Sequence, residues 1–421
     1  MGQRHDRRRP ELDDRWGDLS EPVSGSRKLA PEAPVDPARR VHARSTTVPF
    51  ETPSSSSRGE ARRRRRPQSD RVRRDSFVAA HDDRGRLLST AFDERLRTGA
   101  RNVITRGLCL KADDDLIVVA EPSKAAIAAA LVTEASNLGV RVSALCVDAA
   151  FCADQPLVER LLSSVRNAGA SLLVSSVDLP RGFRRRMIEA NDTGRHGHMV
   201  GVTEEMMRQS VRADFHAVHA LGERLVQLLT PPCRLEVRGA PGTQLEIRCA
   251  QPLRWHNQSG VLQEPGWTNF PGGEIFTTPS SVEGTLVPDG GVWLPDGRCI
   301  GRTGKLRLHF AASRLSHADG PEAPLLMDAL RGVSNARRVG QIALGTNISV
   351  LTPIGALLQD LKMPGLHLTL GDSCAELTRA DFGCTQEIPL LMRRPDVRMD
   401  GEPLLLRGRY ARHLLDAPSF Q

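Results

Sequence analysis

The sequence predicts a protein of the α/β class: an N-terminal parallel α/β sheet domain, then a mostly β (α+β) C-terminal domain, with a disordered basic tail in front. Three observations predict this. Short apolar segments alternate with helical patterns up to about residue 230, which is typical of a parallel sheet covered on both faces. Segments that alternate with period two between Gly and Pro turns follow. The first 75 residues are rich in Pro, Ser and Arg without any hydrophobic period.

We therefore divide the chain into a tail at 1–83, a first domain at 84–230 and a second domain at 231–410. Residues 1–75 hold 19 basic and 12 acidic residues, whereas the rest holds 39 and 38. The run Arg62–Arg66 could bind RNA, a membrane surface or an acidic partner. A solvated tail, or an upstream stretch that is not translated, is the plainer interpretation. We expect no nucleic-acid binding through the nearly neutral folded domains.

The first domain is predicted to open with an amphipathic helix at 93–110, where Leu96, Ala100, Ile104 and Leu108 recur at helical spacing. Apolar strands are predicted to alternate with further helices. The strands lie at 114–122, 141–148 and 170–177, and the helices at 123–138, 156–169 and twice within 203–230.

The second domain is predicted to start with a hairpin of strands 234–239 and 244–249, and to hold a helix at 348–361 and a strand at 366–371. In this last strand the leucines share one face, so His367 points to the other face, toward water or a polar cavity. Two glycines before Glu274 allow the close backbone approach of a tight ligand turn.

Several function classes lose their usual signals. No run approaches the ~20 apolar residues of a membrane span, and the N-terminus has no secretory pattern. The chain also lacks a Walker A pattern, a GxGxxG after a strand, and the GxSxG, HExxH and CxxC motifs. We expect a cytoplasmic protein with no membrane contact, whose eight cysteines are mostly buried and reduced.

Three stretches of the second domain stand out together: PGWTNFPGGEIFTTP at 265–279, GQIALGTN at 340–347 followed by Asp360-Leu361-Lys362, and GLHLTLGD at 365–372. Over roughly 93–404 the chain resembles the aminopeptidase T family of metalloaminopeptidases. Similar motifs occur in the 2,5-dihydroxypyridine dioxygenases, which use a single iron. The resemblance implies an α/β domain, a β-rich domain that holds metal ions, a peptide substrate and a homodimer.

The metal ligands that the resemblance implies fall on Glu274, His367 and Glu387, whereas two further ligand positions hold Gln341 and Thr385. A neutral amide is a poor ligand for a transition metal, and a hydroxyl does not replace an imidazole. The remaining set is suited to one divalent ion (Zn, Co or Fe), as in a facial triad, or to none. Asp372 is an alternative ligand to this set.

Catalytic residues stay unassigned, because the family's catalytic tyrosine has no match and Leu361 replaces the middle acid of its D-E-K. Asp360 and Lys362 are expected to form an ion pair. The residues expected beside the site are Asn269, Asp360, Lys362 and Asp372.

Other polar groups receive structural interpretations. His196 and His198 are assigned to a mobile Gly-flanked loop in preference to a metal site. His216 and His219 are assigned to an exposed helix face, and Arg184–Arg186 to a solvated helix start in preference to a substrate carboxylate site.

Three functions remain open at this point. The first is a metal-dependent aminopeptidase that removes N-terminal residues from peptides. The second is a member that kept the fold but lost the metal chemistry, and that binds peptides or acts as a biosynthetic accessory protein. The third is a single-iron dioxygenase-like site. Whether the chain is an enzyme is thus left undecided by the sequence.

Overall fold

The computed structural model describes residues 76–415 apart from 178, 181, 192 and 241. Nearly all of the predicted tail therefore lies outside the described residues. Its last part, 76–83, does not behave as a tail: Ser76–Ala80 forms helix α1, and Phe77 is only 1% exposed, in contact with the core of the first domain. Residues 76–83 therefore belong to the folded part of the chain, and the tail ends before the predicted boundary at 83.

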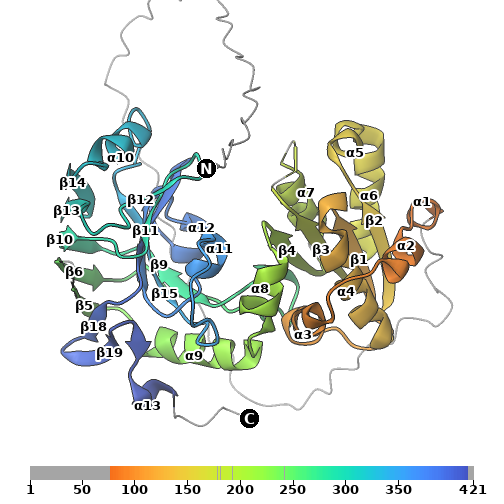
Figure 1. Cartoon of the computed structure of the whole chain (residues 1–421), viewed down its shortest axis with the longest axis horizontal. Coiled ribbons are helices and arrows are strands. Elements are labelled where there is room, and N and C mark those ends of the chain that lie inside the picture. The colour runs from red at the N-terminus through yellow and green to blue at the C-terminus, as the bar shows by residue number, and fades with distance from the viewer. Residues whose placement is uncertain (1–75, 178, 181, 192, 241, 416–421) are drawn as a thin grey trace, which may run out of the picture. The chain divides into compact units, whose positions relative to one another are not determined.

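The first domain is a five-stranded parallel sheet in the order β2-β1-β3-β4-β8 with helices on both faces (Figure 1). One face packs against α3, α4 and α9, and the other against α1, α6 and α7. The strands are β1 Asp115–Ala120, β2 Arg141–Cys146, β3 Ala170–Ser175, β4 Arg195–Val200 and β8 Gly266–Asn269. The helices are α1 Ser76–Ala80, α2 Arg84–Ser89, α3 Arg97–Asn102, α4 Ala125–Asn137, α5 Ala149–Ala153, α6 Gln155–Asn167, α7 Phe183–Ala190, α8 Glu204–Arg208 and α9 Phe215–Leu228.

Most predicted elements of this domain are present with shorter bounds. The helix predicted at 93–110 is a 3₁₀ turn at Glu94–Leu96, then α3, then a π-helical turn at Val103–Gly107, and its apolar stripe is buried as predicted. Strand β8 was not expected here. It comes from beyond residue 230 and pairs with β4 in parallel, so the first sheet is completed by a segment assigned to the second domain.

The second domain contains two antiparallel sheets that share one apolar core (Figure 1). The eight-stranded sheet has the order β14-β13-β10-β6-β5-β18-β19-β20, and the seven-stranded sheet has the order β12-β11-β17-β16-β15-β9-β7. The first consists of β5 Cys233–Gly239, β6 Thr243–Cys249, β10 Ser281–Leu286, β13 Arg307–Ala311, β14 Arg314–Asp319, β18 Asp396–Met399, β19 Glu402–Leu406 and β20 Arg409–Tyr410. The second consists of β7 His256–Gln258, β9 Glu274–Thr277, β11 Gly291–Trp293, β12 Cys299–Ile300, β15 Val339–Gly345, β16 Leu366–Gly371 and β17 Glu387–Met392.

Short helices connect these strands, namely α10 Ala323–Ala329, α11 Leu357–Asp360, α12 Ala375–Thr378 and α13 Arg412–Leu415. The helix predicted at 348–361 is wrong except for α11. Pro353 cannot continue a helix, and Gly355 has a φ of +75°, outside the helical region. The two sheets and the parallel sheet together confirm the predicted fold class.

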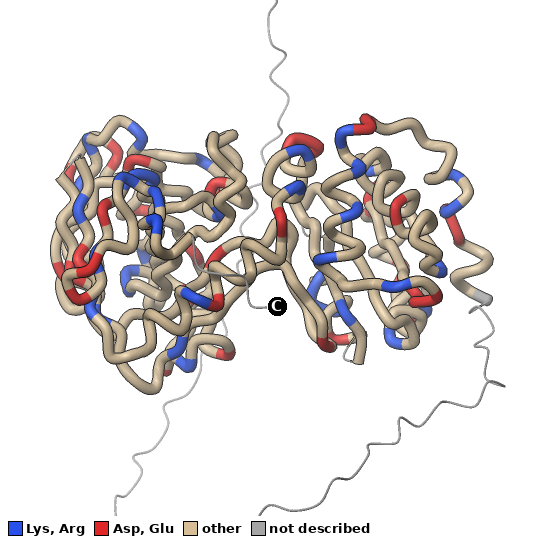
Figure 2. The backbone as a smooth tube through the Cα atoms, turned by 90° about the horizontal axis from the view of Figure 1, so that it is seen from below, with Lys and Arg blue, Asp and Glu red and all other residues tan. Residues whose placement is uncertain are grey.

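No helix among the described residues is long and apolar enough to cross a membrane. Figure 2 shows acidic and basic residues interspersed along the described part of the chain.

Candidate functional site

The polar face of the seven-stranded sheet carries the residues that the sequence singled out. Leu366, Leu368 and Leu370 of β16 pack into the shared core, so His367 projects from the opposite face. The same alternation puts side chains of three other strands on that face, because each is followed along its strand by a core residue: Glu274 of β9, Gln341 of β15 and Glu387 of β17.

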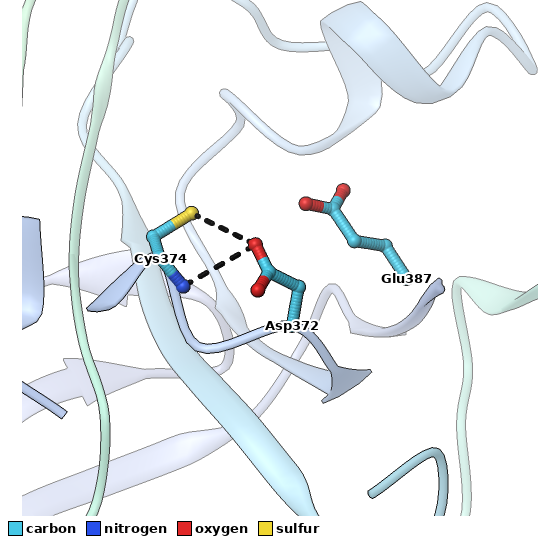
Figure 3. Close-up of side chains that lie close together, drawn as sticks. All are labelled: Asp372, Cys374 and Glu387. Atoms are coloured by element: carbon cyan, nitrogen blue, oxygen red, sulfur yellow. Dashed lines mark hydrogen bonds between the residues drawn. The ribbon is translucent and has the colours of Figure 1, made fainter. Parts of the chain in front are cut away.

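Three potential ligands converge at one end of this face (Figure 3). Asp372 directly follows β16, Cys374 precedes α12, and Glu387 opens β17. Each offers one ligand atom within 4.8 Å of the others. This Asp372–Cys374–Glu387 cluster is the only group of three or more such residues in the part of the chain that the structure describes.

Hydrogen bonds hold the cluster in shape. The backbone N–H of Cys374 donates to Asp372 Oδ2 at 3.3 Å, and its thiol lies 3.6 Å from the same oxygen. Gln341 Nε2 donates to the Asp372 carbonyl at 3.0 Å and to Cys374 Sγ at 3.3 Å. Cys374 has a φ of +49°, a left-handed conformation that costs free energy for a residue with a Cβ and that is concentrated at functional sites.

The electrostatics of the cluster favour a cation. Burial, and then the negative charges of Glu387 and Asp372, raise the pKa of the Cys374 thiol to about 12. Burial, and then the charges of Asp372 and Glu274, raise the pKa of Glu387, while Arg184 opposes this shift. A thiol with such a pKa is protonated at neutral pH and is a poor nucleophile. A divalent cation would reverse these shifts by offsetting the crowded negative charge.

Glu274 lies outside the cluster and forms an ion pair with Lys362, which is 3% exposed. The turn before Glu274 needs its two glycines. A Cβ at Gly272 would lie 2.2 Å from the backbone at Ser259–Gly260, and one at Gly273 would lie 2.7 Å from the Cβ of Asn347. The predicted close approach is thus made to neighbouring chain segments.

His367 is 1% exposed, so it faces a buried polar space and not bulk water. Neither ring nitrogen makes a hydrogen bond of good geometry. Burial lowers the pKa of His367 to about 4, helped by the charges of Lys362 and Arg393 and opposed by the carbonyls of Met363 and Leu361. Like Glu274, His367 does not join the cluster, and the ligand role of both residues stays a prediction.

The expected ion pair between Asp360 and Lys362 is wrong. Asp360 Oδ2 instead binds Arg393 at 3.0 Å, and its carboxylate also accepts the N–H groups of Ile354 and Gly355. Lys362 binds Glu274. Asp360 and Glu274 thus each have a cation of their own.

The predicted mobile loop at His196 and His198 is also wrong, because both lie in strand β4 and are buried. Asn191 Nδ2 donates to Ser171 Oγ at 2.8 Å, and this hydroxyl lies 2.6 Å from His196 Nδ1. His196 Nε2 lies 3.0 Å from His198 Nδ1. We assign the Ser171 hydroxyl as the donor to His196 Nδ1, because it has no other acceptor among the described residues. His196 Nε2 then carries the proton and donates to His198 Nδ1. Burial lowers the pKa of both histidines, that of His198 to about 3, so both are neutral near pH 7.

The other predicted positions are scattered. Asn269 ends β8, where it is paired in register with His198, and Thr385 is exposed before β17. His216 is exposed on α9, and His219 is bound to Ser259 at 2.9 Å. Arg184–Arg186 lie in the first half of α7, mostly exposed, as expected.

Sequence reasoning missed Cys374. Cys374 does not fall on any ligand position that the resemblance implies, and the sequence grouped it with the buried, reduced cysteines. A signal was present nonetheless. Asp372 directly follows Gly371, the last residue of the strand that carries His367, and Cys374 follows after one further residue. A loop at this place can turn both side chains back over the sheet.

Comparison with solved structures agrees with the resemblance seen in the sequence. AmpT (aminopeptidase T) from Thermus thermophilus matches with a TM-score of 0.56 and 20% identity, over 76% of this chain and 100% of that one. The chain has an aminopeptidase T-like fold. The 2,5-dihydroxypyridine dioxygenase from Pseudomonas putida KT2440 also matches, with a TM-score of 0.56 and 17% identity, over 75% of this chain and 97% of that one. No family model and no curated protein matches the sequence.

The described residues do not fit a two-metal site of the family's pattern. Gln341 uses its amide N–H groups to hold the Asp372 loop, Thr385 is exposed, and Glu274 is neutralised by Lys362. They do fit a single cation, because two carboxylates and a thiol each offer a ligand atom within 4.8 Å of the others. Burial and neighbouring negative charges also raise the pKa values of Cys374 and Glu387.

Proposed function

We propose that this chain is a single-metal hydrolase with an aminopeptidase T-like fold, which removes N-terminal residues from peptides. The observation that carries the proposal is the Asp372–Cys374–Glu387 cluster on the polar face of the sheet. The fold alone does not fix the chemistry, and the cluster supplies the donors that the fold comparison lacks.

Asp372, Cys374 and Glu387 would hold the ion, with Cys374 bound as thiolate. A bound zinc, cobalt or iron ion would supply Lewis-acid polarisation of a peptide carbonyl. Gln341 fixes the loop that presents two of the three ligands. Burial and the charge of Asp372 raise the pKa of the Glu387 carboxyl, and this group is the candidate proton donor or acceptor when it is not bound.

A second candidate is a peptide-binding protein without metal chemistry. The buried ion pair of Lys362 with Glu274 favours it, because an ammonium group already offsets the charge of a carboxylate that the resemblance implies as a ligand. The replaced positions Gln341 and Thr385 point the same way.

The two candidates differ in metal content. Full-length protein is purified without chelator, loaded with zinc, cobalt or ferrous iron, desalted and analysed for metal, and then tested for release of leucine from a leucyl dipeptide. The first candidate predicts close to one equivalent of metal and dipeptide cleavage that Asp372→Asn, Cys374→Ser and Glu387→Gln each abolish. Glu376→Gln, which removes a nearby exposed acid of α12, is the matched control and leaves both unchanged.

Metal near zero with retained peptide binding supports the second candidate. One equivalent of iron without peptide cleavage, together with oxygen consumption on an aromatic diol, would instead support a dioxygenase-like site.

A further inference from the structure

Two cysteines face each other at the open end of the hairpin β5–β6. Cys233 is the first residue of β5 and Cys249 is the last residue of β6, and the register pairs them directly. Directly opposed residues of an antiparallel pair have Cα atoms about 4.5–5.5 Å apart. Disulfides form between Cα atoms about 4.4–6.8 Å apart, so the separation typical of a directly opposed pair is compatible with a disulfide.

The surroundings of the pair differ between the two thiols. Both are in the shared apolar core, with Cys233 7% exposed and Cys249 2% exposed. The Cys233 thiol also lies 3.5 Å from the carbonyl oxygen of Leu229. A hydrogen bond between the two thiols lowers the pKa of Cys233 and raises that of Cys249. Cys233 is the less buried of the two thiols, and we assign it as the attacking thiol.

We propose that Cys233 and Cys249 form a peroxide-sensitive dithiol site that closes to a disulfide. The Cys233 thiolate attacks one oxygen of hydrogen peroxide, the O–O bond breaks, and a sulfenic acid and hydroxide result. The Cys249 sulfur then attacks the sulfenic sulfur, the S–O bond breaks and the S–S bond forms. The two thiol protons leave with the oxygen atoms, so two thiols and one peroxide give one disulfide and two water molecules.

The disulfide would fasten a junction of the chain. Cys233 lies five residues after Leu228, the last residue of α9, and Cys249 lies before β7 of the seven-stranded sheet. The crosslink closes the chain from 233 to 249 at the centre of the eight-stranded sheet. It therefore joins the segment that enters this domain to the segment that leaves the hairpin. This site is independent of the metal cluster and of the proposed hydrolase activity.

Tryptic mapping of the full-length protein tests the proposal. Reduced protein is treated with hydrogen peroxide, its free thiols are alkylated, and it is digested without reductant. Trypsin releases Cys233 in the peptide 225–234 and Cys249 in the peptide 249–254. We expect these two peptides to appear joined, two hydrogen atoms lighter than their sum, and to separate after reduction.

Variants exclude a crosslink through other thiols. Cys249→Ser should lose the joined peptide and leave Cys233 oxidised beyond the sulfenic stage, whereas Cys152→Ser, which removes a buried thiol of α5, should keep it. The mapping of the wild-type protein tests the proposal even if a variant fails to fold. The proposal is overturned if Cys233 and Cys249 are both alkylated after peroxide treatment, or if the disulfide that forms joins other cysteines and leaves this pair free.

Discussion

His196 and His367 are both almost fully buried, each as the second residue of a six-residue strand, but the hydrogen bonding of their rings differs. His196 has a polar partner at each ring nitrogen, whereas His367 has none of good geometry at either. The first belongs to a neutral network that begins at Asn191 and ends at His198. Only the outer atoms of this network, Asn191 Oδ1 and His198 Nε2, have no hydrogen-bond partner among the described residues. The second lies on a sheet face that also carries the Lys362–Glu274 ion pair and the Asp372–Cys374–Glu387 cluster.

This difference separates structural polarity from polarity that suits a ligand. A buried polar group with partners is accounted for by folding, since folded proteins pair such groups. Groups whose pKa values are shifted by crowded like charges on one face of a sheet are typical of binding sites. The neutral network and the charged face should therefore respond differently to substitution, to cations and to pH.

The largest expected effect comes from breaking the buried ion pair. Lys362→Met leaves the Glu274 carboxylate buried without a counter-charge, and we expect a loss of about 3–5 kcal/mol in the free energy of unfolding. Urea denaturation measures it. The double variant Lys362→Met, Glu274→Gln should recover most of the loss. If the single variant is as stable as wild type, the ion pair does not stabilise the fold, and the Glu274 carboxylate does not depend on Lys362 as its counter-charge.

Cations should stabilise the charged face and not the neutral network. At a zinc concentration of about 100 times the dissociation constant, binding to the folded chain alone adds about 2.7 kcal/mol. Thermal or urea unfolding with and without zinc measures this gain. Asp372→Asn and Glu387→Gln should lose it, and Glu376→Gln should keep it. A gain that survives both cluster variants would place the cation elsewhere.

The neutral network should lose about 1–3 kcal/mol when its hydroxyl is removed. Ser171→Ala takes away the partner of His196 Nδ1 and one acceptor of Asn191 Nδ2, and buried unpaired groups carry that penalty. Ser316→Ala, at an exposed position of β14, serves as the control, with a change near zero. A loss at Ser171 no larger than at Ser316 would show that the network does not act as a unit.

A change of one pH unit should have the smallest effect. The pKa of His198 is about 3 in the folded chain, below the value of about 6.5 in an unfolded one. Between these values only the unfolded chain takes up the proton, so stability is full above pH 6.5 and falls as pH decreases, by at most about 1.4 kcal/mol per pH unit for this residue. Urea midpoints at pH 7, 6 and 5 should fall less steeply for His198→Asn than for wild type. Equal slopes would mean that folding does not lower the pKa of His198.

Local pattern predicted much of the fold. The apolar strands 115–120, 141–146 and 170–175 and the strand 366–371 were visible as short runs bounded by turn residues. Strand β4 was not, because Arg195, His196, Gly197 and His198 carry no apolar run. Its burial depends on partners such as Ser171 that are distant in sequence, and single-sequence periodicity does not contain that information.

The site was predictable only in part. The resemblance drew attention to one face of the seven-stranded sheet, and Glu274, Gln341, His367 and Glu387 all project from that face. It did not indicate which side chains meet. Lys362 was paired with its neighbour Asp360 on spacing alone, while the fold gives it to Glu274, 88 residues away. Cys374 joined the cluster through a left-handed loop conformation, which composition does not reveal.

Strand β8 has a consequence for how the polypeptide must assemble. Because Gly266–Asn269 supplies the last strand of a sheet whose other members end by Val200, the polypeptide cannot be cut at the junction near 230 into two self-sufficient pieces. The N-terminal fragment would have β4 as an exposed edge strand that can pair with other chains. The sheet can be completed only after about seventy further residues have been synthesised. Because this strand pairing is long-range, we expect folding to be slow and the two domains to fold together.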